Sequence, residues 1–191
     1  MIFGRSREEK EIRQIGQGDA AAMKSLYDTH IGYLTAVCSR YIIDEDDLKD
    51  VLQDSFIKIF TSIDKFEYRG KGSVRAWLTR IVVNEALTFL KKKERLDVVH
   101  TEWGLPEQDD TGSEDATSLA DQVSPEQVQE LIRQLPPGYR TVFNLYVFEN
   151  KSHREIAKIL NIKENTSASQ LHKAKSMLAK KIKQLRMPNY G

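Results

Sequence analysis

Residues 152–182 read SHREIAKILNIKENTSASQLHKAKSMLAKKI, and this stretch decides which fold to expect. Ser152, followed three residues later by Glu155, is the pattern of a capping box, which predicts that a helix begins here. Asn161 tolerates the left-handed conformation that often ends a helix, so a turn should follow. A second helix is expected from about Asn165 onward, and the whole stretch therefore predicts a helix-turn-helix.

The second helix of this stretch has two chemically different faces. Ser167 falls on the apolar face, where its hydroxyl needs a hydrogen-bond partner. The apolar side chains lie within roughly 40° of one line on a helical wheel and should be buried; they are Leu171, Ala174, Leu178, Ile182 and Leu185. The other face carries hydroxyls, an amide and cations that suit the base edges and phosphates of a major groove. The predicted DNA-binding residues, including one arginine from the preceding helix, are Arg154, Thr166, Ser169, Gln170, His172, Lys173 and Ser176.

Two further helices are predicted just before the helix-turn-helix. Ser124-Pro125-Glu126-Gln127 combines a cap residue, a proline at the first helical position and a glutamine three residues after the cap. Pro136-Pro137-Gly138 ends that helix and starts another, over residues 139–148. Residues 124–191 are therefore predicted to form one small helical domain.

Charge divides the chain into three parts, although the formal net charge of the 191 residues is only +1. Residues 1–95 are near balance, whereas residues 96–132 contain ten acidic residues and no lysine or arginine. Residues 133–191 carry twelve basic side chains against three acidic ones, a net charge of about +9, which favours phosphate binding. Because the acidic part is also poor in periodic apolar residues, residues 96–123 are predicted to be a linker.

Three amphipathic helices are predicted within residues 18–95. Apolar residues recur at three- and four-residue steps over residues 19–42 and 44–63, and again over residues 74–93. The chain is therefore expected to be all-α, with two small helical domains joined by an acidic linker. Residues 1–17 are expected to be an N-terminal extension.

The loop of residues 65–72 combines two aromatic rings, three cations and two glycines, and Ser73 can cap the helix after it. Such a loop beside a polar helical stripe suits single-stranded DNA, because bases stack on aromatic rings and cations meet phosphates. A core aromatic pair beside a solvated face would produce the same pattern, and Trp77, on the apolar side of the helix, is expected in the core. The candidate residues are Phe66, Tyr68, Arg69, Lys71, Arg80, Asn84 and Lys91.

Several classes of protein lack support in the sequence. No apolar run approaches the ~20 residues of a membrane span, and residues 1–15 lack the apolar stretch of a secretory signal. We therefore expect a cytoplasmic protein without membrane insertion. Cys38 should be a buried thiol, and the four histidines have no partners at metal-ligand spacing. Since no nucleophile, phosphate-loop or dinucleotide motif occurs either, we expect no catalytic residue, no metal and no cofactor.

Four segments, two in each half, match the motifs of one family. Residues 47–56, DLKDVLQDSF, are similar to its DAEDLVQEVF, and residues 66–84 are similar to F…FRTWLxRIAxN. Residues 135–143, LPPGYRTVF, and 155–160, EIAKIL, are similar to LPxxxRxVF and EIAxxL. With these motifs the chain resembles the extracytoplasmic-function (ECF) group of sigma factors of bacterial RNA polymerase. The recognition helix departs from the usual TVKSRLHRA, because residues 166–174 read TSASQLHKA and lack two of its cations.

The resemblance implies promoter recognition, local promoter opening and transcription initiation, without catalysis by the chain itself. Residues 18–95 would be the region 2 domain, whose loop captures an extruded base of the −10 element and must offset a few kcal/mol of unstacking. Residues 124–191 would be the region 4 domain, which docks on the −35 element. The implied partners are the RNA polymerase core, promoter DNA and an anti-sigma factor. The implied contacts to the clamp helices of the polymerase are Asp47, Asp50, Gln53 and Asp54.

Two other functions remain compatible with the residues alone. The first is a helix-turn-helix transcriptional regulator that binds DNA independently of polymerase. The second is a helical adaptor whose basic face contacts an acidic protein. The adaptor would show no salt-dependent affinity for DNA, whereas phosphate binding weakens steeply with added salt.

Overall fold

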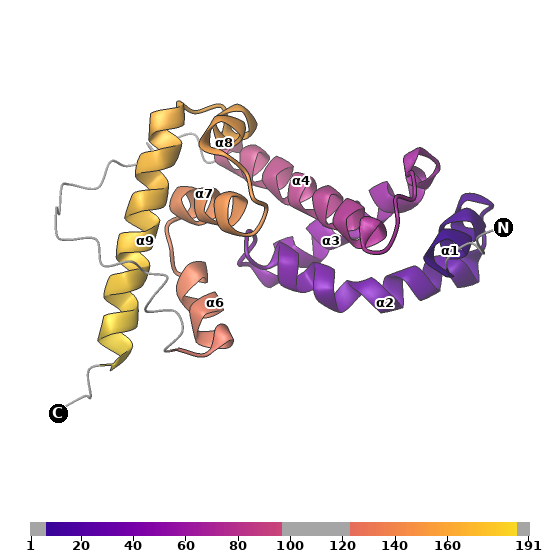
Figure 1. Cartoon of the computed structure of the whole chain (residues 1–191), viewed down its shortest axis with the longest axis horizontal. Coiled ribbons are helices and arrows are strands. Elements are labelled where there is room, and N and C mark those ends of the chain that lie inside the picture. The colour runs from indigo at the N-terminus through magenta and orange to yellow at the C-terminus, as the bar shows by residue number, and fades with distance from the viewer. Residues whose placement is uncertain (1–6, 97–122, 187–191) are drawn as a thin grey trace. The chain divides into compact units, whose positions relative to one another are not determined.

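The computed structural model describes residues 7–96 and 123–186, and within these ranges all regular structure is helical (Figure 1). The predicted all-α fold is therefore confirmed. The chain divides into two compact units, Met1–Val98 and Val99–Gly191. Nearly all of the predicted acidic linker, residues 96–123, lies outside the described residues.

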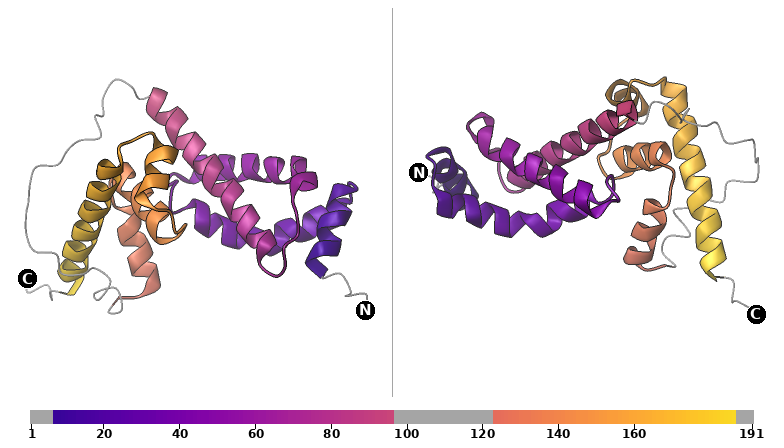
Figure 2. Two further views of the ribbon diagram at one scale, coloured as in Figure 1. Left: turned by 45° about the horizontal axis from the view of Figure 1, so that its top comes forward. Right: turned by 180° about the vertical axis from the view of Figure 1, so that it is seen from behind.

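The first unit consists of four described α-helices and one turn of 3-10 helix. Helices α2, α3 and α4 pack on one another, and α1 packs against α2 and the 3-10 turn η1 (Figure 2). Buried apolar side chains from all three long helices form the core, including Leu34, Ile59 and Leu78. The elements are α1 (Arg7–Gly16), α2 (Ala20–Cys38), α3 (Glu45–Thr61), η1 (Ile63–Lys65) and α4 (Ser73–Leu96).

Carboxylate caps set where two of these helices begin. The Asp19 side chain accepts hydrogen bonds from the backbone N–H groups of Ala21 (2.8 Å) and Ala22 (3.1 Å). The Asp44 side chain does the same for Asp46 and Asp47, at 3.0 Å each. These caps leave fewer orphan N–H groups in the first turn, which stabilises each helix start.

The ends of α2 and α3 differ from the sequence prediction. The prediction continued the first helix to residue 42, but α2 ends at Cys38 and a tight turn follows, in which the N–H of Tyr41 donates to the carbonyl of Cys38 (2.9 Å). Tyr41 and Ile42 are nonetheless buried. Apolar periodicity reports burial rather than helicity, so it ran past the true helix end. For the same reason the predicted helix over residues 44–63 ends at Thr61, and Ile63 is buried within η1.

The second unit consists of four described helices, with α9 as the common packing partner of α6, α7 and α8. Both predicted capping boxes are present, Ser124 with Gln127 and Ser152 with Glu155. Asn161 adopts the predicted left-handed conformation, with φ 56° and ψ 46°. The elements are α6 (Pro125–Arg133), α7 (Pro137–Val147), α8 (His153–Leu160) and α9 (Glu164–Arg186).

The predicted buried line of α9 holds over four of its five positions. Leu171, Ala174, Leu178 and Ile182 are buried, but Leu185 is 54% exposed, so that part of the prediction is wrong. Helix α9 has 23 residues, whereas α6, α7 and α8 have 9, 11 and 8. The shorter helices do not cover α9 to its end, and an apolar residue in its last turn therefore meets solvent.

Candidate nucleic-acid interface

Helices α8 and α9 present most of the predicted DNA-binding residues of the second unit at the surface. At four-residue and three-residue steps along α9, side chains return to the same side of the helix, here the side away from the buried line. The exposed members are Arg154, Thr166, Ser169 and His172, and the partly exposed members are Lys173 and Ser176. The structure therefore brings hydroxyls and cations together on one surface.

Gln170 is the exception in this set. It is only 8% exposed, and its side-chain carbonyl oxygen has no hydrogen-bond partner. The prediction placed Gln170 beside the outward face, yet the residue also lies about 40° from the buried Ala174 on the helical wheel. Because α7 and α8 both pack on α9, they cover more of its circumference than one line. The predicted exposed position of Gln170 is therefore wrong.

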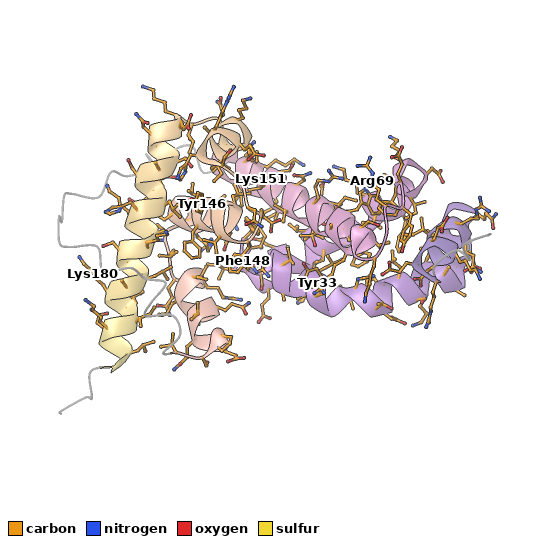
Figure 3. The ribbon with its side chains drawn as sticks, in the orientation of Figure 1. Tyr33, Arg69, Tyr146, Phe148, Lys151 and Lys180 are labelled. Carbon is orange, nitrogen blue, oxygen red and sulfur yellow. The ribbon has the colours of Figure 1, made fainter. Side chains whose placement is uncertain are left out.

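A polar contact joins the two helices of the helix-turn-helix. Ser167, predicted to be buried and in need of a partner, is 0% exposed, and its Oγ lies 3.0 Å from Nδ1 of His153 in a hydrogen bond. The His153 ring in turn stacks on Tyr146, with ring centroids 4.9 Å apart. Tyr146, labelled in Figure 3, belongs to α7 and is exposed. This chain of contacts links α7, α8 and α9 and so helps to set the angle of the recognition helix.

In the first unit, the loop before α4 presents cations at the surface while its aromatic rings are half-buried. The Phe66 ring lies 5.0 Å from the Trp77 ring, centroid to centroid. Trp77 is itself half-buried, so the expectation that it lies wholly in the core is wrong. Arg69, labelled in Figure 3, and Lys71 are exposed. The loop therefore offers both stacking surfaces and positive charge.

The end of this loop is shaped by Ser73 and two glycines. The Ser73 hydroxyl donates to the carbonyl of Gly70 (2.7 Å) and accepts from the N–H of Arg69 (3.2 Å). Gly70 and Gly72 have φ values of +105° and +86°, which residues with a Cβ atom rarely adopt. The loop therefore turns sharply into α4 without strain.

The polar stripe predicted on α4 is exposed. Arg80, Asn84 and Lys91 all lie at the surface of α4. Steps of four and seven residues bring these side chains to one side of the helix. The structure thus places a cation, an amide and a second cation along the helix that leaves the loop.

The acidic face of α3 is exposed at three of its four predicted positions. Asp50, Gln53 and Asp54 are exposed, whereas Asp47 is partly covered. The Asp47 carboxylate accepts a hydrogen bond from Lys93 of α4, with Nζ to Oδ2 at 2.5 Å. Asp47 therefore already connects α3 with α4. A binding partner would have to replace its ion pair with Lys93.

Other kinds of site find no support in the described parts of the chain. Among residues 7–96 and 123–186, no cluster of three or more histidine, cysteine or acidic side chains could hold a metal ion. Within the same ranges no helix is both long and apolar enough to cross a membrane. Cys38 is buried as predicted, and burial raises the pKa of its thiol to about 12, which disfavours the reactive thiolate.

Comparisons with known proteins match both units. The family Sigma-70 region 2 matches residues 26–96, and the family Sigma-70, region 4 matches residues 125–178. The ECF RNA polymerase sigma-E factor of Haemophilus influenzae is 30% identical over 190 residues, which cover 91% of this chain and 94% of that protein. The chain belongs to the ECF sigma factors of RNA polymerase.

Two further similarities complete the comparison of this sigma factor. The ECF RNA polymerase sigma factor SigW of Bacillus subtilis is 29% identical over 191 residues, covering 93% of this chain and 97% of that protein. The sigma factor RpoE of Bartonella quintana, solved in complex with the anti-sigma factor NepR, aligns with a TM-score of 0.49 at 20% identity. That alignment covers 85% of this chain and 97% of the other.

The two matched regions contain all the candidate residues of this sigma factor. The candidates in the loop and on α3 and α4 fall within the region 2 match, and those on α8 and α9 fall within the region 4 match. Helix α1, Arg7–Gly16, lies before the region 2 match. The region 2 family model therefore does not describe this helix.

Sequence reasoning missed three residues around the region 2 loop. The Tyr68 hydroxyl donates to Oε2 of Glu8 in α1 (3.3 Å), and the guanidinium of Arg75 lies 3.6 Å from the centre of the Tyr33 ring. The partners in these pairs are separated by 60 and 42 positions in the chain. Patterns within one helix or loop cannot reveal such pairs, because only the tertiary fold brings the partners together.

Proposed function

We propose that residues 18–95 of this sigma factor form the domain that binds the polymerase clamp and the −10 element, and that residues 124–191 bind the −35 element. Residues 96–123 would connect them, and residues 1–17 would form an N-terminal extension. One observation carries the proposal: two separate compact units each present polar and basic side chains suited to nucleic acid. One chain can therefore contact two promoter elements at once.

At the −10 element, the loop and α4 would act together. The half-buried rings would stack on an extruded base, and the exposed cations would meet phosphates of the separated strand. Exposed polar groups on α4 would continue the path along the DNA. The residues proposed for this contact are Phe66, Tyr68, Arg69, Lys71, Arg80, Asn84 and Lys91.

At the −35 element, α9 would enter the major groove. Hydroxyls and a histidine on its outward face would meet base edges, while cations on α8 and α9 would contact phosphates. Gln170 is omitted because it is buried. The residues proposed for this contact are Arg154, Thr166, Ser169, His172, Lys173 and Ser176.

For the polymerase, we propose the acidic face of α3 as the contact. Asp50, Gln53 and Asp54 are exposed and available to a basic partner surface. Asp47 would contribute less, since it is already paired with Lys93. A surface of this kind steers association through long-range attraction and fixes the register of the complex.

The remaining features follow from the same function. Sigma factors in general are not enzymes, and we propose that this chain likewise catalyses nothing and delivers the polymerase to promoters. It would act in the cytoplasm, where polymerase and DNA meet. An anti-sigma factor, which the family resemblance implies, would control its availability.

The proposal is tested by mixing the purified chain with core polymerase and measuring holoenzyme formation and initiation on a promoter library. We expect a stable complex that initiates from a subset of promoters. Asp50→Lys with Asp54→Lys should weaken the complex about tenfold or more, because charge reversal places like charges at the contact. Asp28→Lys, a charge reversal on α2, is the matched control and should leave it unchanged.

Two outcomes would overturn the proposal. Failure of the wild-type chain to bind core polymerase would exclude the sigma function in this chain. Tight binding to duplex DNA without polymerase, together with no effect of the double reversal, would favour the independent regulator instead.

A further inference from the structure

Helix α1 lies against the loop of residues 65–72, which we call the −10 loop, although the region 2 family match does not include this helix. It packs on α2 and on η1, the turn that leads into the loop, and the views of Figure 2 show it beside that turn. Ile15 is its buried anchor. In its first turn, Glu8 accepts the hydrogen bond from the Tyr68 hydroxyl at 3.3 Å. The middle of the loop is therefore tied to a segment 60 positions earlier in the chain.

The other contacts of the loop are local, and one of them, between Arg69 and Glu67 (3.0 Å), also lies near its middle. At the start, Phe66 packs on Trp77. At the end, Ser73 holds the backbone at Arg69 and Gly70. These contacts all belong to the connection between α3 and α4. The contact of Tyr68 with α1 is of a different kind, because it relates the centre of the loop to a separate helix.

The surroundings of Glu8 allow this acceptor role. His30 of α2 interacts electrostatically with the carboxylates of Glu8 and Glu11 and with the guanidinium of Arg75 in α4. Burial lowers the pKa of His30, Arg75 lowers it further, and the two carboxylates oppose this change. The imidazole is therefore mainly neutral at pH 7, and it does not draw the Glu8 carboxylate away from Tyr68 as an imidazolium would.

We propose that Glu8 is a positioning residue for promoter DNA: by accepting the hydrogen bond from Tyr68, α1 holds the −10 loop in the conformation that binds the separated strand. This inference rests on the proposed function of the loop. An ordered loop loses less conformational entropy when DNA binds, and pre-ordering of this kind raises affinity. Helix α1 is thus part of the DNA-binding element rather than an inert extension.

The test uses the holoenzyme and a single-stranded probe. A pool of oligonucleotides with a randomised central segment is first enriched with wild-type holoenzyme, and one enriched sequence is labelled for fluorescence anisotropy. Glu8→Ala and Tyr68→Phe should each weaken binding about threefold to tenfold, the usual effect of one hydrogen bond. The double variant should be no weaker than either single variant, because both changes remove the same contact.

Two further variants separate positioning from charge and from general damage. Glu8→Gln keeps an acceptor oxygen without the charge, and it should bind within about twofold of wild type. Asp28→Ala removes an exposed carboxylate that pairs with Lys24 on α2, and it should bind as wild type does. Enrichment from the random pool should also become less selective with Glu8→Ala, while holoenzyme formation and the melting temperature stay unchanged. A merely structural role would not produce that combination.

The results distinguish the inference from the function on which it rests. If wild-type holoenzyme forms and enriches a sequence, but Glu8→Ala binds it equally tightly or more tightly, the positioning role is wrong. Additive losses in the double variant would also overturn it. If wild-type chain forms no holoenzyme, or the holoenzyme enriches no sequence, the proposed function itself fails.

Discussion

The two units of the molecule bury different kinds of side chain. In the described part of the first unit the buried polar residues are Ser39 and Ser55. The Ser39 hydroxyl, just after α2, donates to the carbonyl of Ala36 (3.1 Å), and the Ser55 hydroxyl donates to the carbonyl of Val51 in its own helix (2.6 Å). In the second unit the described buried polar residues are Arg140, Thr141, Asn144, Ser167 and Gln170.

The difference follows from helix length. Helices α6, α7 and α8 have 9, 11 and 8 residues, so a large fraction of their backbone groups belongs to a terminal turn without helical partners. Arg140 of α7 reaches two such groups, the carbonyls of Arg133 and Leu135 at the end of α6. Helices α2, α3 and α4 are longer and can rely on an apolar core. The second unit should therefore depend on individual polar contacts, whereas the first unit should tolerate their loss.

Arg140→Met should have the largest effect on the free energy of unfolding among the variants that test this comparison. The Arg140 guanidinium donates through Nη1 to the carbonyls of Arg133 (2.9 Å) and Leu135 (3.2 Å), where α6 ends. Burial and the charge of Arg133 lower the pKa of Arg140 to about 10, so it stays protonated at pH 7. The substitution leaves a buried carbonyl and a partly buried carbonyl without this donor and should reduce the free energy of unfolding by about 2–4 kcal/mol. Hydrogen exchange on α7 amides measures this loss.

Exchange on α2 amides serves as the internal reference for that measurement, since it reports the first unit. Lys151→Ala is the matched control, because it removes a half-exposed pair with Glu155 at 3.7 Å in the same unit and should cost less than about 0.5 kcal/mol. Equal losses in both units, or no loss in α7, would contradict the comparison.

The second test compares two buried hydroxyls. Ser167→Ala breaks the contact between α9 and His153 of α8, and it should lower the free energy of unfolding of the second unit by about 1 kcal/mol. Ser55→Ala breaks a bond within its own helix, to a carbonyl that the helix already engages, and should cost less. Denaturant titration followed by hydrogen exchange in each unit ranks the two. A larger loss for Ser55→Ala would reverse the comparison.

A smaller effect is expected from the surface pair between α3 and α4. Lys58 donates to Glu85 at 2.5 Å, and the lysine side chain is 58% exposed. Lys58→Ala should change the free energy of unfolding by only about 0.2–1 kcal/mol, with the difference shrinking as NaCl is added. Thermal unfolding at low and high salt measures it. A loss above about 2 kcal/mol would show that the first unit also depends on single polar contacts.

The smallest expected signal is a pH slope in the first unit. Burial lowers the pKa of His30 from its ordinary value of 6.5, so the folded state holds this proton less tightly than the unfolded state does. The free energy of unfolding should therefore fall as the pH drops below about 6.5 toward the lowered pKa of the folded state. His30→Gln should flatten that slope, measured by hydrogen exchange on α2 between pH 7 and pH 5. An unchanged slope would assign the pH dependence to other groups.

Local signals made much of this molecule predictable. The signals that locate the helices act over about one helical turn. They are the caps at Ser124 and Ser152, the left-handed turn at Asn161 and the three- and four-residue spacing of apolar residues. These signals are sufficient to locate the helices and the helix-turn-helix in the sequence. The same local motifs carry the family resemblance that the comparisons confirm.

The sequence by itself determined the helices, their caps and the chemistry of their outward faces, because these depend on neighbours a few residues apart. Only the tertiary structure decided that Gln170 is buried, that Leu185 is exposed, that Asp47 pairs with Lys93 and that Glu8 meets Tyr68. Burial depends on how far another helix extends, and a contact between distant residues depends on how helices cross. Neither quantity is encoded in the spacing of residues along one helix.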